Sequence, residues 1–169
     1  NRQDPLQPVG LPVAAIGLVI FQGLLGMWTV TLLLKPAIVS AHLAGGLTTM
    51  ALLWWMALQA PRRSRVHSED SLRRWAVIGM AVLAVQILLG GWVSSNYSAV
   101  ACPDFPTCQR SYWPDMDFKD AFVLWRGLGI DYEGGVLDHP ARVAIHFTHR
   151  IGAIVAAFVL GFVAFKAVR

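Results

Sequence analysis

The amino-acid sequence predicts an all-α membrane protein with four transmembrane helices and one long outer loop. Hydrophobic residues make up 56% of the 169 residues, charged residues make up 14%, and the mean hydropathy is +0.53. Apolar stretches of about 20 residues match the thickness of a bilayer core. Four such stretches occur, near residues 11–34, 37–59, 75–95 and 141–165. The composition and these stretches exclude an ordinary soluble domain.

The first two apolar stretches are separated only by Lys35 and Pro36. Proline cannot continue the hydrogen-bond ladder of a helix, and a lysine at this position is expected at the lipid surface. We therefore predict a helical hairpin with a tight turn at these two residues.

An internal repeat relates the first and third apolar stretches. QGLLGMWTV at residues 22–30 resembles QILLGGWVS at residues 86–94. Parallel repeats of this kind predict two similar helical halves. The repeat also carries glycines that would let helices approach closely, namely Gly23, Gly26, Gly90 and Gly91. The glutamines and glycines serve either helix packing or contact with a cofactor, and the repeat alone does not choose between them.

The distribution of charge predicts how the chain crosses the membrane. Residues 61–74 contain five arginines and two acids, whereas residues 96–138 contain seven acids and three bases. The positive-inside rule places the first segment in the cytoplasm. Both ends of the chain are then cytoplasmic, with Lys166 and Arg169 on the inner side, and loop 96–138 is periplasmic or extracellular. The net charge of +4 and the pI near 9.5 reflect this topology rather than nucleic-acid binding.

The start of the chain does not resemble a targeting segment. Residues 1–10 have neither the basic start nor the apolar run of a signal peptide, and the first residue is not methionine. We expect the sequence to be a piece of a larger protein.

The outer loop contains the only two cysteines, Cys102 and Cys108, in the segment CPDFPTC. Because the predicted topology places them on the oxidising side of the membrane, we expect a disulfide, with either a structural or a redox role. Two cysteines alone do not complete a tetrahedral zinc site. The spacing also excludes covalent heme attachment of the C-x-x-C-H type.

Further along the loop, apolar residues recur at helical spacing between charged ones. These apolar residues are Phe118, Ala121, Phe122 and Trp125. The pattern predicts an amphipathic helix lying on the outer face of the membrane. Such a helix would cover a cofactor pocket, guide a hydrophobic substrate from the bilayer, or simply rest on lipid.

Three histidines fall within the predicted membrane spans: His42, His146 and His149. An imidazole at membrane depth is costly unless it is paired or ligating, and neutral imidazole is a common ligand of heme iron. The rise of a helix places all three roughly 7 to 12 Å below the outer surface. A hydrogen bond to a neighbouring helix is the alternative for each histidine, whereas His67 and His139 are expected to be ordinary solvated residues.

The neighbours of these histidines also suit a heme. Ala44, Gly45 and Gly46 follow His42 and leave space for a flat macrocycle. Arg150 follows His149 directly, and an arginine there suits a heme propionate through charge-assisted hydrogen bonds.

Several of these segments, taken in order, carry a family resemblance: QGLLGMWTV, the AHLAGG around His42, QILLGGWVSSNYSAVACPDFPTC and AIHFTHR. Together they resemble heme A synthase, a membrane enzyme of cytochrome oxidase assembly. The resemblance implies eight transmembrane helices in two pseudo-symmetric four-helix halves, of which this chain resembles the third to sixth. Residues 1–60 would then end the first half, residues 61–74 would form a cytoplasmic basic loop, and residues 75–169 would begin the second half, including loop 96–138.

The resemblance also implies roles for individual residues. His42 matches the histidine at the substrate heme, and His149 matches a ligand of the cofactor heme b. Depth alone would pair His42 with His146, and the adjacent Arg150 favours His149. The partner histidines, and the acidic residue thought to take part in catalysis, would lie outside this chain, so the catalytic residue here is unknown. The cysteine pair matches a family pair associated with a disulfide.

The implied activity is the oxidation of a methyl group of heme O to a formyl group, yielding heme A. Heme O synthase and the cytochrome oxidase under assembly are the implied partners, the membrane lipid surrounds the helices, and a homo-oligomer remains open. The implied location is a bacterial-type inner (plasma) membrane. Two other classes remain: an electron-carrying cytochrome b with one heme between His42 and His149, and a membrane assembly scaffold without a cofactor.

Overall fold

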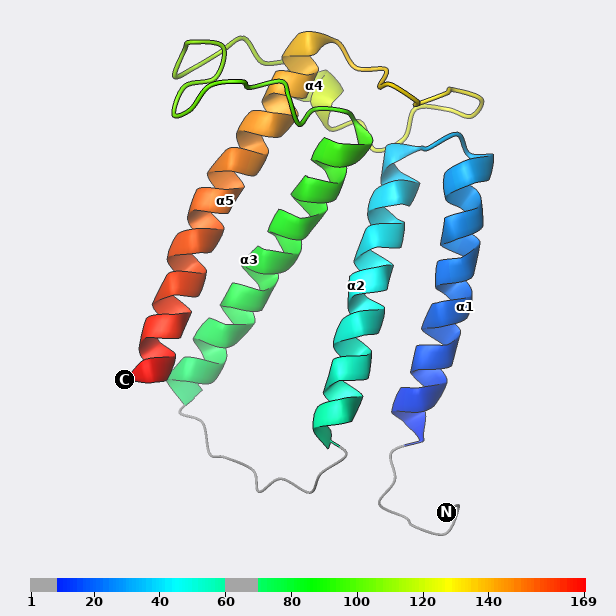
Figure 1. The fold of residues 1–169 in the computed structure, drawn as a ribbon, viewed down its shortest axis with the longest axis vertical. Coiled ribbons are helices and arrows are strands. Elements are labelled where there is room, and N and C mark those ends of the chain that lie inside the picture. Colours follow the sequence, from blue (N-terminus) through cyan, green and yellow to red (C-terminus); the bar gives the residue numbers. More distant parts are fainter. Residues whose placement is uncertain (1–8, 60–69) are drawn as a thin grey trace.

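The four long helices lie side by side in a row. This computed structural model describes residues 9–59 and 70–169. Its long helices are α1 (Gly10–Thr31), α2 (Pro36–Gln59), α3 (Asp70–Ser95) and α5 (His139–Val168). Only neighbours in the order α1, α2, α3, α5 contact one another, so the described helices form a layer rather than a closed bundle (Figure 1). Each of the four is long and apolar enough to cross a membrane, which confirms the predicted fold class.

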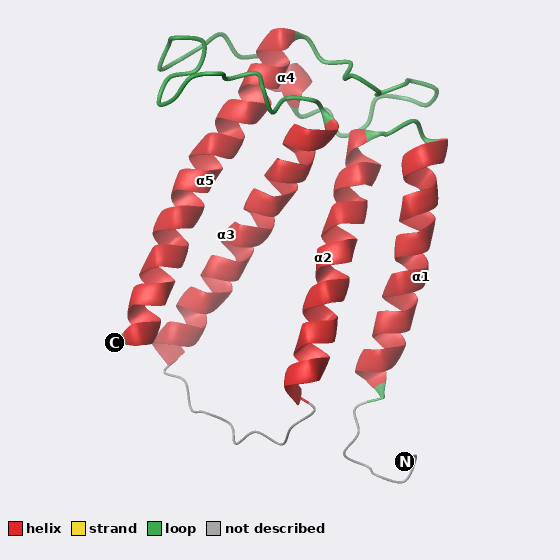
Figure 2. Cartoon of the chain, in the orientation of Figure 1, coloured by secondary structure: helices red, strands yellow, loops and turns green. Residues whose placement is uncertain are grey.

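The helices alternate in direction, and one end of the layer is covered by the long loop. α1 and α3 run toward this end, whereas α2 and α5 run away from it (Figure 2). We call it the loop end. At the opposite end, Lys166 Nζ donates to Ser71 Oγ at 2.8 Å, which joins the end of α5 to the start of α3. Much of the predicted basic segment 61–74, with His67, and most of the N-terminal segment 1–10 lie outside the described residues.

The turn between α1 and α2 forms as predicted, but Lys35 does not lie at the lipid surface. Leu33 and Leu34 adopt positive φ angles of 52° and 59°, and α2 begins at Pro36. The Lys35 side chain is only 2% exposed because the long loop folds over it. Its ammonium donates to the carbonyl oxygen of Gly127 and lies 3.5 Å from the centre of the Trp125 ring. The Lys35 ammonium is therefore stabilised by a backbone carbonyl and an aromatic ring, and not by the bilayer surface as predicted.

The amphipathic helix predicted in the loop is reduced to a single turn. α4 spans only Phe118–Ala121, and Trp125 lies beyond its end. Asp117 caps the turn, since its Oδ1 accepts from the backbone N–H groups of Lys119 at 2.9 Å and Asp120 at 3.1 Å. The prediction of a helix through Phe122 and Trp125 is therefore wrong.

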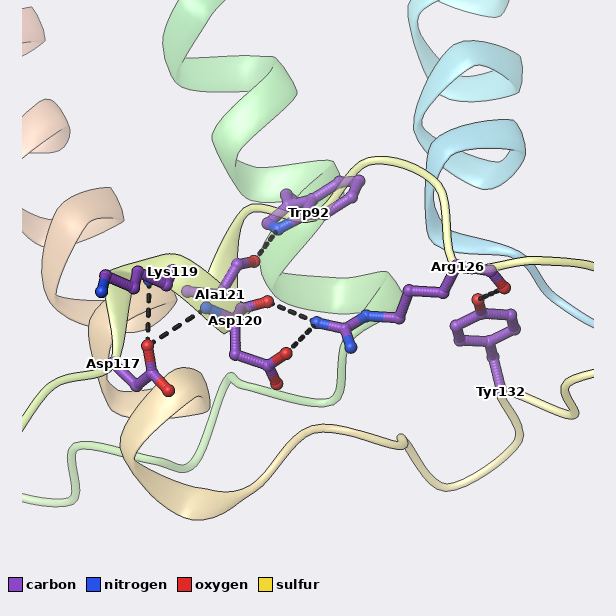
Figure 3. Close-up of polar contacts among 7 residues, drawn as sticks. All are labelled: Trp92, Asp117, Lys119, Asp120, Ala121, Arg126 and Tyr132. Atoms are coloured by element: carbon purple, nitrogen blue, oxygen red, sulfur yellow. Dashed lines mark hydrogen bonds and ion pairs between the residues drawn. The ribbon is translucent and has the colours of Figure 1, made fainter.

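Two side chains explain why α4 ends early. Trp92 Nε1 donates to the Ala121 carbonyl at 2.9 Å, and the Arg126 guanidinium donates to the Asp120 carbonyl at 2.5 Å (Figure 3). A continuing helix would use these two carbonyls for its next turn. Arg126 also forms an ion pair with the Asp120 carboxylate at 2.6 Å, which holds the chain in its bent course. Tertiary contacts thus override the local helical pattern.

The buried core lies at the loop end, where α3 and α5 meet the loop. Its members are Trp92, Val93, Ala121, Leu137, Ala141, Ala144 and Ile145. Large apolar side chains along the rest of the long helices are often exposed, for example Ile16, Trp54, Val77 and Phe158. Such surfaces suit contact with lipid or with further helices.

Candidate functional site

In the α1–α2 pair, a glutamine is tethered to the backbone of a histidine. Gln22 Nε2 donates to the carbonyl oxygen of His42 at 2.9 Å. Gly45 makes room for this amide, because a Cβ atom there would overlap Gln22 Oε1. Gly26 lies against the imidazole, and a Cβ atom at Gly26 would lie 3.4 Å from His42 Cε1. His42 is therefore packed against α1 through two glycines and one amide.

The α3–α5 pair contains the same arrangement. Gln86 Nε2 donates to the carbonyl oxygen of His149 at 3.1 Å. A Cβ atom at Gly152 would overlap Gln86 Oε1, and a Cβ atom at Gly90 would lie 3.4 Å from His149 Cε1. In each pair the glycine beside the imidazole follows the glutamine by four residues, and the glycine beside the amide follows the histidine by three. His149, rather than His146, therefore occupies the position equivalent to His42.

The two imidazoles differ in one hydrogen bond. Gln86 Nε2 lies 3.0 Å from His149 Nδ1, so the amide contacts the ring as well as the backbone. Gln22 reaches only the backbone, and His42 Nδ1 is buried without a hydrogen-bond partner. The oxygens Gln22 Oε1 and Gln86 Oε1 are also buried without partners. The second imidazole is thus fixed by its neighbour, whereas the first is not.

His146 and Arg150, which flank His149 on α5, contact the cysteine loop. The sulfur atoms of Cys102 and Cys108 are joined in a disulfide in this structure, with 4.6 Å between their Cα atoms. The Cys102 backbone N–H donates to His146 Nδ1 at 3.2 Å. The Arg150 guanidinium donates to the Cys102 carbonyl at 2.6 Å. Both side chains therefore hold the loop against α5.

Arg150 also binds two more carbonyls of the same loop. Its Nη1 donates to the carbonyl oxygens of Asp104 at 2.7 Å and Thr107 at 3.0 Å. Three backbone carbonyls thus surround one guanidinium. In this arrangement the predicted contact with a heme propionate would have to compete with, or add to, these bonds.

The Asp104 carboxylate stabilises the loop from within. It accepts from the Thr107 hydroxyl and from the Arg110 backbone N–H, the latter at 3.0 Å. Because these donors favour the charged form, with the Thr107 hydroxyl as the largest influence, the pKa of Asp104 lies below its usual value of 3.8. The carboxylate is thus ionised at neutral pH and orders a turn of the cysteine loop.

The residues present fit a heme better than a multi-ligand metal site. Among residues 9–59 and 70–169, no three His, Cys, Asp or Glu side chains gather to hold a metal ion. A heme needs only axial protein ligands, and imidazole is the commonest of these. In the described part of the chain, neither His42 Nε2 nor His149 Nε2 forms a hydrogen bond, so no neighbouring side chain occupies these two ring nitrogens.

The groove beside the Gln86 tether is apolar. It has a volume of about 310 Å³ and is lined by Ala81, Val82, Val85, Gln86, Gly152 and Val155 of α3 and α5. The groove therefore lies further from the loop end than the hydrogen bond between Gln86 and the His149 carbonyl. An apolar surface of this kind suits a hydrophobic macrocycle or lipid.

The structure does not bring His42 and His149 together. α3 lies between α2 and α5, and the described parts of α2 and α5 do not contact each other. The His42 imidazole instead lies against Gly26 of α1, and the His149 imidazole lies against Gly90 of α3. His139 is exposed at the loop end, as expected for a solvated residue.

Sequence reasoning missed the way in which the halves are joined. The loop that connects α3 to α5 binds the first hairpin at two points. The Lys35 ammonium donates to the Gly127 carbonyl, and the Tyr132 backbone N–H donates to the Leu33 carbonyl at 3.1 Å. No sequence pattern marks these contacts. The sequence did single out the two glutamines, because Gln22 and Gln86 occupy the same position in the repeat.

Comparisons with known proteins agree on one family. A family model described as cytochrome oxidase assembly protein matches residues 2–169. A protein named heme A synthase from Shewanella oneidensis is 42% identical over 167 residues, which cover 97% of this chain and 51% of that protein. One of the same name from Caulobacter vibrioides is 31% identical over 170 residues, covering 95% and 46%. The chain thus spans about half the length of these curated relatives. No solved structure matches it.

Proposed function

Because this chain belongs to the cytochrome oxidase assembly protein family, we propose that it supplies the central helices of a heme A synthase. The enzyme would oxidise a methyl group of heme O to a formyl group through a hydroxylated intermediate, yielding heme A. The relatives that carry the name heme A synthase support this activity. The repeated arrangement of glutamine, glycine and histidine in the two helix pairs is the structural observation that supports it.

Each helix pair would serve one heme. Residues 1–60 would end the first half of the protein and bind the substrate heme O through His42. Residues 75–169 would begin the second half and bind the cofactor heme b through His149, with residues 61–74 as the cytoplasmic connection. Heme b supplies one-electron redox chemistry when it is bound. A second axial ligand for either heme would come from outside this chain.

The residues around each histidine have defined tasks in this proposal. The glycines allow a flat macrocycle to approach the helices, and the glutamine tethers hold the helical turns that carry the imidazoles. His146 and Arg150 hold the disulfide loop over α5, close to His149, and thereby limit the access of water. Both terminal nitrogens of Arg150 donate to carbonyls of this loop. Because Arg150 directly follows His149, it would also bind a propionate of the second heme.

The setting follows from the same family. We propose an inner (plasma) membrane location with loop 96–138 on the periplasmic or extracellular side and both ends of the chain in the cytoplasm. The charge distribution along the sequence supports this orientation. Heme O synthase would deliver the substrate and the cytochrome oxidase under assembly would receive the product. A homo-oligomer is compatible with the exposed apolar faces of the helices.

The separation of the two histidines argues against the cytochrome b alternative. One heme ligated by both His42 and His149 would require the two rings to face each other, yet α3 lies between their helices. A scaffold without a cofactor would leave two intramembrane imidazoles, each with an unbonded Nε2, unexplained.

Analysis of cellular hemes tests the proposed reaction. Hemes would be extracted from cells that carry the complete gene and from cells that lack it, and then separated by chromatography. We expect heme A only in cells that carry the gene, and accumulated heme O in the deletion strain. Equal amounts of heme A in both strains would reject the activity.

A further inference from the structure

A basic residue lies seven positions before each of the two equivalent histidines. KPAIVSAHLAG at residues 35–45 resembles RVAIHFTHRIG at residues 142–152, with Lys35 matching Arg142. The repeat thus extends to α2 and α5, and it aligns the same two histidines as the glutamine contacts do. Because both helices begin at the loop end, each half carries a positive charge on the loop-end side of its histidine.

We propose that Arg142 binds a propionate carboxylate of the heme that His149 ligates. This inference rests on the proposed function and adds a ligand-binding residue to its second site. The matching Lys35 does not share this task, because the loop already provides acceptors for its ammonium.

The Arg142 guanidinium lacks a partner in the part of the chain that the structure describes. Its Nε is buried without a hydrogen-bond partner. Asp138 precedes Arg142 by four residues on the same helix, a spacing at which side chains can meet, yet no ion pair among the described residues involves Arg142. A partly buried guanidinium without an acceptor is costly, so Arg142 is expected to bind an anion.

Two other cations near the histidines already have acceptors within the chain. The Lys35 ammonium donates to the Gly127 carbonyl and lies 3.5 Å from the centre of the Trp125 ring. Arg150 donates to three carbonyls of the cysteine loop. Arg142 differs from both, because its acceptor has to come from outside the described residues.

Arg142 lies where a propionate of this heme is expected. Seven residues make nearly two helical turns, so Arg142 and His149 share a face of α5, about 10.5 Å apart along its axis. The propionates project from one edge of the macrocycle, and burial of their charge in hydrocarbon is costly, so this edge should point to the nearer end of the membrane span. His149 lies nearer to the start of α5 at His139 than to its end at Val168, so that end is the loop end. Arg142 lies on this side of His149.

The chemistry of the guanidinium suits this ligand. Its planar fork presents parallel N–H groups to the two oxygens of a carboxylate, whereas a lysine ammonium offers the charge without the fork. A hydrogen bond to a charged partner is strong enough to change binding roughly 10- to 100-fold. Esterification of the propionates removes their charge, and with it the partner proposed for Arg142.

The test uses the complete protein in a His42→Ala background, so that the bound heme belongs to the second half. Heme b and its dimethyl ester would each be titrated into the heme-free protein in detergent, with the absorbance spectrum as the signal. We expect Arg142→Gln to weaken binding of heme b roughly 10- to 100-fold and to leave binding of the ester within about threefold. Arg142→Lys should keep part of the preference for heme b over the ester.

Two control variants accompany these measurements. Asp138→Asn removes the carboxylate nearest to Arg142 along the helix, and Lys35→Gln removes the matching cation of the first half. Both should leave the affinity for heme b within about twofold of the background, because neither residue contacts the proposed ligand.

The outcomes separate this inference from the proposed function. Unchanged binding of heme b in Arg142→Gln, or equal weakening for heme b and its ester, would overturn the role of Arg142 alone. A background protein that binds both ligands equally well would do the same without any variant of Arg142. An equal loss in either control variant would show that the effect is not specific to Arg142 and would also overturn the inference. Heme b that still binds after His149→Ala would instead overturn the heme assignment on which the inference rests.

Discussion

Arg150 donates to the backbone carbonyl of Cys102 at 2.6 Å, which joins α5 to the disulfide loop immediately after His149. The same guanidinium binds two further carbonyls of that loop, so one side chain organises the segment between the cysteines. An arginine expected to serve a cofactor thus also has a structural role, and the ordered loop lies beside the proposed heme ligand His149.

Replacement of Arg150 by methionine should loosen this loop. The variant leaves three backbone carbonyls without their charged donor, and the loss of a buried hydrogen-bond partner costs about 1 to 3 kcal/mol. We expect a lower melting temperature and faster proteolysis within loop 96–138. Arg110→Met provides the control because the Arg110 side chain is exposed. Proteolysis of both variants at the wild-type rate would contradict the structural role.

Opening the disulfide should destabilise the same region. Cys102 and Cys108 are six positions apart, and closing a loop of this size in the unfolded chain is worth about 2 kcal/mol. We therefore expect Cys102→Ser with Cys108→Ser, or a reductant, to lower the melting temperature. Mass spectrometry after alkylation would count the thiols before and after reduction. Free thiols in the untreated protein would show that the bond does not form in the membrane.

The buried ammonium of Lys35 should be energetically coupled to Trp125. The ammonium lies 3.5 Å from the ring centre and is largely shielded from water. A double-mutant cycle with Lys35→Met and Trp125→Leu should give a coupling free energy of about 0.5 to 2 kcal/mol. Denaturant unfolding in detergent supplies the four free energies. Additive effects of the two substitutions would mean that the cation and the ring do not stabilise each other.

Trp92 and Trp28 occupy equivalent places in the repeat but should respond differently to substitution. Trp92 Nε1 donates to the Ala121 carbonyl, whereas the described residues offer no such partner to Trp28. Trp92→Phe should cost about 1 kcal/mol of unfolding free energy and release the α4 turn. Trp28→Phe, the matched control, should cost less, and equal losses would argue that ring packing alone is responsible.

Acid should loosen the cysteine loop through Asp104. Its pKa is lowered in the folded protein, chiefly by the Thr107 hydroxyl, so the carboxylate contributes stability above the unfolded value near 3.8. That contribution is lost as the pH falls through the lower folded pKa. We expect pepsin cleavage of the loop to rise below about pH 3.8 in the wild type. Asp104→Asn should remove this dependence when the two proteins are compared at each pH, and identical profiles would contradict it.

The sequence by itself determined the membrane-spanning helices, the hairpin at Pro36 and the repeat. These features depend on the length of apolar stretches relative to the bilayer and on the missing N–H of proline, both of which are local properties. The repeat also placed Gln22 and Gln86 at equivalent positions. It could not show that each amide binds the backbone of a histidine on the next helix.

Only the tertiary structure decided which histidines correspond and what the neighbouring side chains bind. Depth alone still favours His146, because His42 lies six residues beyond the start of α2, whereas His146 lies seven and His149 ten residues beyond the start of α5. The amide and glycine contacts instead pair His149 with His42. The contacts of Gln86, Arg150 and Lys35 join residues 43 to 92 positions apart. Periodicity carries no information at such separations, because it reports which face of a helix is apolar and not which donor reaches which carbonyl.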